Sequence, residues 1–497
     1  MQKEKALQSF NKKYADSFTP YPKSIRALKD GFVFMAKGEK EKFLILMEKS
    51  SIGRFQADVI GKIEVDSTAI TVKVAGLTHH NLIQLREFFP FLSPSPASLK
   101  KSFGTGDRLG IATPAHLRAF EGKDIFPVLA QQSVRENERT GRSFERVLDD
   151  AIWGCFETGY EGRFGADADH VKKIEDLKEA VECGYTMFTI DPSDFVRDDI
   201  FNLKEEEREK LYSLLPEKKE LEKCYLEKSY NIKGKNLSFD RKSLRDISLI
   251  YCKALQHVVK CYRFLDEHKK GGFDFEVSVD ETSLPTSFLA HIFIVEELHR
   301  EKVDFQNLAL RFVGEWQKGI DYIGDVEKFG KEVSLHAKIA RHLGGYKLSL
   351  HSGSDKFSVY PVFAEKTEGK FHIKTSGTSY LEAIKVIARK NPSLYREIHL
   401  FALKNFEKDK ASYHVTTDLS LVPDIDKILD KNLETLLETP NSRQLIHITY
   451  GSVLNAKDKK GEYLFKDRIY RTLFRYEDEH HSQVSSHIKK HLDLLKI

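Results

Sequence analysis

The chain has 497 residues, of which 40% are hydrophobic and 31% charged, and its formal net charge is only +4. This small surplus provides no concentrated positive field for nucleic acid, and no apolar run approaches the roughly 20 residues that cross a bilayer. We therefore expect neither nucleic acid nor a membrane as a partner. The five cysteines include no C-x-x-C pair, and the opening MQKEKALQSFNKKY has no apolar secretory core. These features favour a globular protein of the reducing cytoplasm, too long for one minimal domain.

Residues 1–95 are expected to form a small α/β module. The segments FVFMA, KFLILM and ITVKVAG have the composition of short strands, and NLIQLREFFPFL has the spacing of a helix. The stretch SPSPAS at 93–98 marks the end of this module, because closely spaced prolines interrupt both helices and strands.

Eight segments that alternate polar and apolar residues come next, and most precede a stretch with helical periodicity. They are SFGTGDR from Ser102, FPVLAQQS from Phe126, RFGADADHV from Arg163, TMFTIDPSD from Thr186, FDFEVSVDET from Phe273, LALRFVGEW from Leu308, YKLSLHSGSD from Tyr346 and FHIKTSGTS from Phe371. The repeated order of strand, polar tip and helix predicts an α/β fold, a (β/α)8 TIM-like barrel over residues 96–390, with its chemistry at the carboxyl ends of the strands. A helical insertion at about 195–272 interrupts the repeat, and residues 391–497 are expected to form a helical C-terminal extension.

The alternation also predicts which side chains face the barrel interior, because successive side chains in a strand point to opposite faces. In FDFEVSVDE, Phe275 and Val277 must face the helices, which turns Glu276 and Asp280 inward. The same reasoning directs a further set of polar side chains inward: Thr189, Asp191, Arg311, Glu315, Lys347, Ser349, His351, His372, Lys374 and Ser376. Unpaired buried polar groups are costly, so a substrate or a metal ion is their expected partner.

The tip GADADHVK indicates a metal site. Its Asp167, Asp169 and His170, together with His351 and an acid from the fifth or sixth strand, could bind Zn, Mn, Co or Fe. A turn or capping role is the alternative for this tip. Burial would raise the pKa of a carboxyl group such as Glu276, which suits acid and base catalysis. The alternative is an internal salt bridge with Arg311 or Lys374.

The segment QQSVRENERTGR predicts contacts with substrate, since amide and guanidinium donors suit sugar hydroxyls and a carboxylate. Gln132, Ser133 and Arg135 are expected to reach the site, whereas Glu136 or Glu138 and at least one of the three arginines are expected to cap helices or form surface ion pairs. His414 and His447 lie beyond the barrel repeat and are expected to be core histidines, and the alternative is that the C-terminal extension folds over the mouth and makes them ligands.

Taken together, several long motifs resemble those of the tagaturonate/fructuronate epimerase family, from about Leu99 to the C-terminus. They are QQSVRENERTGR, FGADADHVK, FTIDPSD, FEVSVDET, LALRFVGEW, LHSGSDKFSVYP, KTSGTSYLEA and RQLIHITYGSVL. The resemblance implies an isomerase of hexuronate breakdown that depends on a divalent cation (Zn, Mn, Co, Ni or Fe) and inverts C4 between tagaturonate and fructuronate. Related members also act on tagatose and fructose.

Because C4 is not adjacent to the keto carbon, the implied chemistry is reversible aldol cleavage of the C3–C4 bond. A metal would polarise the ketone, and a base would take the proton of the C4 hydroxyl. By motif position the resemblance assigns this base to Asp169, the opposing acid to Glu276 and metal ligation to His170 and His351. Glu315 is the expected third ligand and Asp280 the second choice. The expected substrate-binding residues are Gln132, Ser133, Arg135, Asp280, Arg311 and Lys374.

Three other classes of protein share parts of this pattern. A metal-dependent aldolase would release the two fragments instead of rejoining them, and needs nearly the same site. A glycosyltransferase would use Asp167 and Asp169 to bind a nucleotide sugar through a metal. A non-catalytic sugar-binding protein would not need an acid, a base and metal ligands at one barrel mouth.

Overall fold

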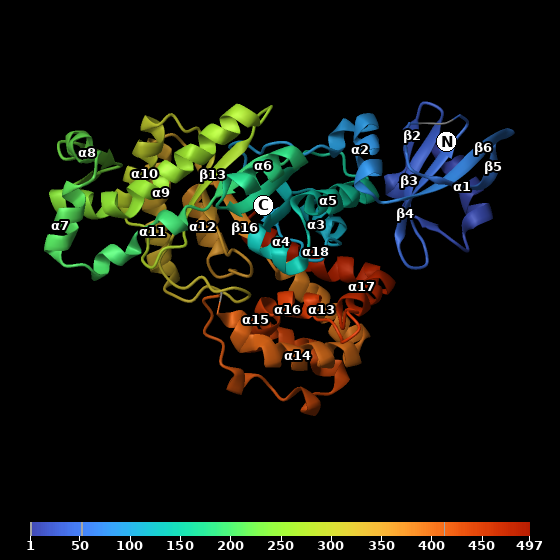
Figure 1. Ribbon diagram of the computed structural model, residues 1–497. Coiled ribbons are helices and arrows are strands. Elements are labelled where there is room, and N and C mark those ends of the chain that lie inside the picture. The colour runs from blue at the N-terminus through green and yellow to red at the C-terminus, as the bar shows by residue number, and fades with distance from the viewer. Residues whose placement is uncertain (1, 51–52, 412) are drawn as a thin grey trace.

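Eight parallel strands close a barrel at the centre of the computed structural model, which describes residues 2–50, 53–411 and 413–497 (Figure 1). The strands are β7 (Ser102–Thr105), β8 (Phe126–Ser133), β9 (Gly165–Val171), β10 (Met187–Ile190), β13 (Asp274–Val279), β14 (Asn307–Leu310), β15 (Lys347–Leu350) and β16 (Phe371–Thr375). They follow one another around the barrel in chain order, and β16 pairs with β7 to close it. The predicted (β/α)8 barrel is thus confirmed.

Helices cover the outside of the barrel and bury the apolar face of each strand. They are α3 (Thr113–Phe120), α4 (Val134–Thr140), α5 (Phe144–Thr158), α6 (Ile174–Cys183), α9 (Arg241–His268), α10 (Phe288–Arg300), α11 (Val326–His342), α12 (Tyr360–Thr367) and α13 (Thr378–Lys390). Several begin at a side chain that accepts a hydrogen bond from the first turn, as Ser143 does from the Arg146 amide of α5. Helix α5 ends at Gly159, whose φ of +68° suits glycine.

The insertion before α9 is not wholly helical, contrary to expectation. It contains α7 (Glu205–Ser213), α8 (Lys218–Tyr225) and a hairpin of β11 (Ser229–Ile232) and β12 (Lys235–Ser238). Tyr230 and Ile232 are buried while Ser229 is exposed, which is the alternation of a half-buried strand. Lys233 and Gly234 both adopt positive φ and make the tight turn. The dense charge around this short segment concealed its alternation.

The N-terminal module packs a helix on an antiparallel sheet. Its elements are α1 (Gln2–Tyr14), β1 (Thr19–Pro20), β2 (Arg26–Leu28), β3 (Gly31–Lys37), β4 (Lys42–Glu48), β5 (Asp58–Val65), β6 (Thr68–Gly76) and α2 (His79–Phe88). Phe10 of α1 meets Phe34 of β3 edge to face, with ring centroids 5.0 Å apart. The expected strands at β3, β4 and β6 are present, whereas β1, β2 and β5 were not expected.

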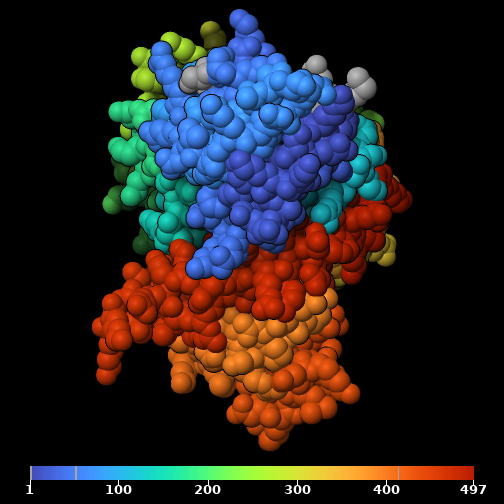
Figure 2. Space-filling view, turned by 90° about the vertical axis from the view of Figure 1, so that its right-hand side faces the viewer, coloured from blue at the N-terminus to red at the C-terminus, as the bar shows by residue number. Residues whose placement is uncertain are grey.

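The C-terminal extension consists of α14 (Pro392–Lys410), α15 (Pro440–Ile448), α16 (Tyr450–Asn455), α17 (Lys466–Arg475) and α18 (Glu477–Leu494). Helix α18 returns to the barrel and packs against α3 and α13. At its start, Glu477 accepts hydrogen bonds from Tyr21 and Lys37 of the N-terminal module, and the red C-terminal helices lie against the blue module in Figure 2. The two ends of the chain therefore hold one another. None of the described helices is both long and apolar enough to cross a membrane.

Candidate active site

A buried lysine gathers three carboxylates inside the barrel. The Nζ atom of Lys374, on β16, lies 2.6 Å from Asp167 Oδ2, 2.7 Å from Asp169 Oδ1 and 2.9 Å from Glu276 Oε1. These acids come from β9 and β13 on the other side of the barrel. All four side chains point inward. The alternation predicted this for Glu276 and Lys374, and Asp167 and Asp169 of β9 follow the same rule.

This grouping shifts the pKa values of its members. Burial disfavours the charge of Lys374, but the attraction of Asp167, Asp169 and Glu276 outweighs burial and raises the lysine pKa. Burial would likewise raise the pKa of Glu276, yet Lys374 and His351 hold it well below its usual range. Burial of Asp169 is similarly outweighed by His170 and Lys374, so its pKa is also lowered. Lys374 thus keeps Asp169 and Glu276 ionised.

Two histidines and an aspartate meet directly above this cluster. One donor atom from each of His170, Asp280 and His351 lies within 4.8 Å of the others, and the two imidazole centroids are 4.8 Å apart. His170 points into the cavity beside Asp169, although neighbours in a strand normally face opposite sides. Its φ of +51° breaks the regular strand, and the register of β9 against β10 shifts at the same place. This irregularity brings Asp169 and His170 to one face.

The three side chains offer two nitrogens and one oxygen, a donor set that suits Zn, Mn, Co, Ni or Fe. Asp169 Oδ1 lies 2.8 Å from His170 Nδ1, which leaves His170 Nε2 directed away from the carboxylate. A carboxylate that orients a ligating histidine in this way is a recurrent feature of metal sites. His351 is fixed similarly, with Nε2 2.6 Å from Glu276 Oε1 and Nδ1 3.2 Å from Asp280 Oδ1. The donors present therefore fit a divalent cation.

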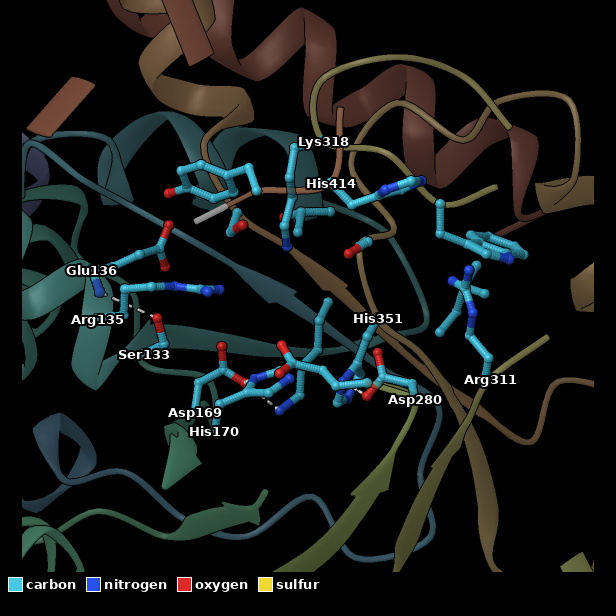
Figure 3. Close-up of a pocket in the computed structure, with 18 of the residues that line it drawn as sticks. Ser133, Arg135, Glu136, Asp169, His170, Asp280, Arg311, Lys318, His351 and His414 are labelled. Atoms are coloured by element: carbon cyan, nitrogen blue, oxygen red, sulfur yellow. Dashed lines mark hydrogen bonds and ion pairs between the residues drawn. The ribbon is translucent and has the colours of Figure 1, made fainter. Parts of the chain in front are cut away.

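Above these residues lies a cavity of about 440 Å³ at the carboxyl ends of the strands (Figure 3). The expected site residues that line it are Ser133, Arg135, Asp169, His170, Asp280, Arg311, Glu315, His351 and Lys374. In Figure 3, Asp169, His170, His351 and Asp280 lie along its floor, Ser133 and Arg135 on one side, and Arg311 on the other. A cavity of this size accommodates a six-carbon sugar acid.

Two of the expected residues do not line the cavity. Gln132 faces the surrounding helices, where its amide donates to Thr140 at 3.0 Å, and Gln131 lines the cavity in its place. The reason is the alternation of β8: Ser133 faces inward, so Gln131 must as well and Gln132 cannot. Glu276 is fully buried beneath the floor, where it contacts His351 and Lys374.

Glu315 was expected to complete the metal site, but the structure groups Asp280 with the two histidines instead. Strand β14 ends at Leu310, so the inward and outward alternation no longer applies at Glu315. Glu315 is half-exposed and lies 2.7 Å from His414 Nε2. The expectation that His414 is a core histidine is also wrong, since its side chain is 72% exposed and borders the cavity. His447 is buried, as expected.

Other cavity residues were not anticipated from the sequence. Lys318 comes from the loop after β14, and Tyr413 and His414 come from the C-terminal extension. Arg108 follows β7, where its guanidinium pairs with Glu136 at 2.9 Å and lies over the ring of Tyr450. Arg108 ends one of the predicted polar strand tips, and Lys318 lies in an irregular loop of the barrel. Tyr413 and His414 have no local pattern, because the docking of the extension onto the barrel brings them to the cavity.

A barrel with a polar cavity at the carboxyl ends of its strands defines an enzyme that acts on a small polar molecule. Comparison with known proteins narrows this class. Residues 21–495 match the tagaturonate epimerase family, and the chain belongs to that family. It is therefore an isomerase that acts as a carbohydrate epimerase.

The similarity extends over nearly the whole chain. Over 491 residues the chain is 50% identical to the tagaturonate/fructuronate epimerase of Thermotoga maritima, and the match covers 99% of both chains. Two crystal structures of the fructuronate-tagaturonate epimerase of Cohnella laeviribosi, one native and one with a glycerol, are 39% identical and have TM-scores of 0.92. Each match covers 99% of both chains. The resemblance inferred from the motifs is confirmed.

Proposed function

We propose that this protein interconverts D-tagaturonate and D-fructuronate by inverting C4, and that it does so with a divalent cation through reversible aldol cleavage. The observation that carries the proposal is the floor of the cavity. There Asp169, His170, Asp280 and His351 face one space of about 440 Å³, in a chain of the tagaturonate epimerase family. The proposal extends to the neutral ketoses tagatose and fructose, since they share the keto end of the molecule.

Asp169 is the base in this proposal. Its carboxylate borders the cavity and is kept ionised by His170 and Lys374, so it can accept the proton of the C4 hydroxyl. As that proton leaves, the O–H electrons form the carbonyl at C4 and the C3–C4 pair moves toward the ketone. The three-carbon aldehyde acid then turns about its C4–C5 bond and presents its other face. The C3–C4 bond forms again, and the proton returns to the C4 oxygen.

His170, Asp280 and His351 are the proposed metal ligands. When bound, a divalent cation would supply Lewis-acid polarisation of the ketone. The chain itself fixes the ligand geometry, because Asp169 orients His170 and Glu276 orients His351.

Glu276 has a positioning role in this proposal instead of the acid role that the resemblance implied. It is fully buried under the cavity floor, with Oε1 2.6 Å from His351 Nε2 and 2.9 Å from Lys374 Nζ. A carboxyl group so enclosed does not border the cavity and cannot contact the substrate directly. Its charge instead stabilises Lys374 and aims the imidazole of His351.

An NMR assay in D2O tests reaction, mechanism and metal together. Chelator-treated protein is incubated with D-tagaturonate and with each of a panel of divalent ions. We expect D-fructuronate to appear only after metal is restored, with the C4 hydrogen retained, because aldol cleavage never breaks the C4–H bond. Uptake of solvent deuterium at C4 would exclude the aldol route, and full activity after chelation would exclude the metal. Net release of three-carbon products would identify a lyase.

A further inference from the structure

Some of the lysines and arginines that line the cavity have no acid partner among the described residues. Arg108 pairs with Glu136, and the ammonium group of Lys374 is shared among three carboxylates. Across the described ranges of the chain, no acid pairs with Lys318 or Arg311 and no hydrogen-bond acceptor contacts their charged groups. Arg135 is on the exposed start of α4, where its guanidinium carbon lies 5.4 Å from the ring centroid of Tyr413. A negatively charged ligand is the natural partner of a free cation in such a cavity.

The backbone beneath Lys318 is unusually well fixed. Four consecutive carbonyls in the loop after β14 accept hydrogen bonds from side chains. Lys356 donates to the carbonyls of residues 317 and 320 at 2.8 and 2.5 Å, Gln444 donates to residue 318 at 3.2 Å, and Arg443 donates to residue 319 at 2.9 Å. An unconstrained loop would leave these carbonyls to water. Here they fix the position from which Lys318 extends.

The side chains of Lys356 and Arg443, which donate these hydrogen bonds, are themselves buried and make further hydrogen bonds. Lys356 is fully buried, and its third hydrogen bond goes to the Ser354 carbonyl at 3.1 Å. Arg443 of α15 also donates to the Asp355 carboxylate at 2.8 Å. Gly319 adopts a φ of +74°, and a Cβ there would lie 3.2 Å from His447, so this turn favours glycine. Side chains of both the extension and the barrel thus hold the loop. Because burying polar groups is unfavourable, their use here indicates that the position of the loop matters.

Lys318 alone among the free cations faces the cavity floor. In Figure 3 its side chain descends from the roof toward Asp169 and His170, whereas Arg311 lies at one side, beyond Asp280. A substrate whose keto end is at the floor would present its far end to Lys318. In a keto-hexuronate that far end is the carboxylate of C6.

We propose that the Lys318 ammonium group binds the substrate carboxylate and keeps the aldehyde fragment in the cavity while that fragment turns. This inference rests on the proposed function above. The ammonium of Lys318 is a compact point charge that can pair with this carboxylate. Rotation about the C4–C5 bond turns only the aldehyde group, so the carboxylate keeps its ion pair while the fragment presents its other face. Lys318 would then favour acidic sugars over neutral ones.

The test compares Lys318→Met with wild type on D-tagaturonate and on D-tagatose, and measures free three-carbon aldehyde acid with an aldehyde trap. One charge-assisted contact corresponds to about a 10- to 100-fold rise in KM for tagaturonate. We expect the loss of kcat/KM on tagaturonate to exceed any loss on tagatose by about tenfold or more. We also expect the variant to release the aldehyde fragment, which the wild type retains.

Three controls make the result decisive. Lys328→Met removes an exposed lysine of α11 and should match the wild type, and an unchanged thermal midpoint shows that Lys318→Met folds. Lys318→Arg should restore most of the tagaturonate binding and the retention of the fragment, because it keeps the positive charge. Wild-type kinetics and fragment retention in Lys318→Met would overturn the inference, as would equal losses on both sugars. A wild-type protein that leaves tagaturonate unchanged would instead overturn the proposed function.

Discussion

Two buried lysines inside the barrel provide a direct test of the charge network. Lys374 touches three carboxylates. Lys347, on the adjacent β15, instead donates to two neutral acceptors, the Lys100 carbonyl at 2.9 Å and Ser102 Oγ at 3.0 Å. Replacing Lys374 by methionine leaves the buried carboxylates without their cation, which should lower the free energy of unfolding by about 3–5 kcal/mol. Lys347→Met removes two hydrogen bonds and also a buried charge, so its net effect should be smaller, about 1–2 kcal/mol.

The assay is thermal unfolding followed by circular dichroism at pH 7, in chelator so that bound metal does not contribute. For a chain of this length each kcal/mol shifts the midpoint by about 1 °C, so a loss of about 3–5 kcal/mol lowers it by about 3–5 °C, against about 1–2 °C for the smaller loss. Lys374→Arg should recover part of the difference, because it keeps the charge. If Lys374→Met melts within about 2 °C of wild type, or no lower than Lys347→Met, the lysine does not hold the three acids together.

Three further outcomes follow from the same geometry. Burial lowers the pKa of Lys347 to about 8. In the unfolded chain its pKa is about 10.4, so between about pH 8 and about pH 10.4 the unfolded state binds one more proton than the folded state. The free energy of unfolding should therefore rise by up to about 3 kcal/mol over this pH range. Urea titrations that show no such rise relative to Lys347→Met would contradict it. In a chelator competition, His351→Ala or Asp280→Asn should weaken divalent-ion binding by on the order of 100-fold, while Glu315→Gln changes it less than about twofold. If Glu315→Gln weakens binding as much as the other two, Glu315 is a metal ligand after all. Asp169→Asn should lower kcat by about 10²- to 10⁴-fold, and retained turnover would rule out Asp169 as the base.

Local patterns in the sequence predicted the barrel and most of its floor. Inward carboxylates and Lys374 follow from the alternation of the strands, which depends only on which side chains are apolar. The prediction failed for Gln132 because it was chosen by residue type without applying that same alternation to β8. It failed for Glu315 because β14 is short and the chain has left the strand by that point.

The roof of the cavity could not be predicted in this way. His414 reaches it through the docking of the extension on the barrel, and Lys318 lies in an irregular loop after β14, so neither has a periodic signature in the sequence. The metal cluster is an intermediate case. The motif indicated His170, but its place beside Asp169 depends on a backbone irregularity with φ of +51°, which residue patterns do not reveal.

The hydrogen bonds from Arg443 and Gln444 to the loop that carries Lys318 can form only after the C-terminal extension has been synthesised. During synthesis the eighth strand emerges well before α15, so the barrel has all its strands while the roof of its cavity is still absent. At that stage Lys356 of the barrel can already bind the carbonyls of residues 317 and 320, but the bonds from Arg443 and Gln444 are still missing. Under the proposals above, the C-terminal helices thus belong to the substrate site as well as to the fold.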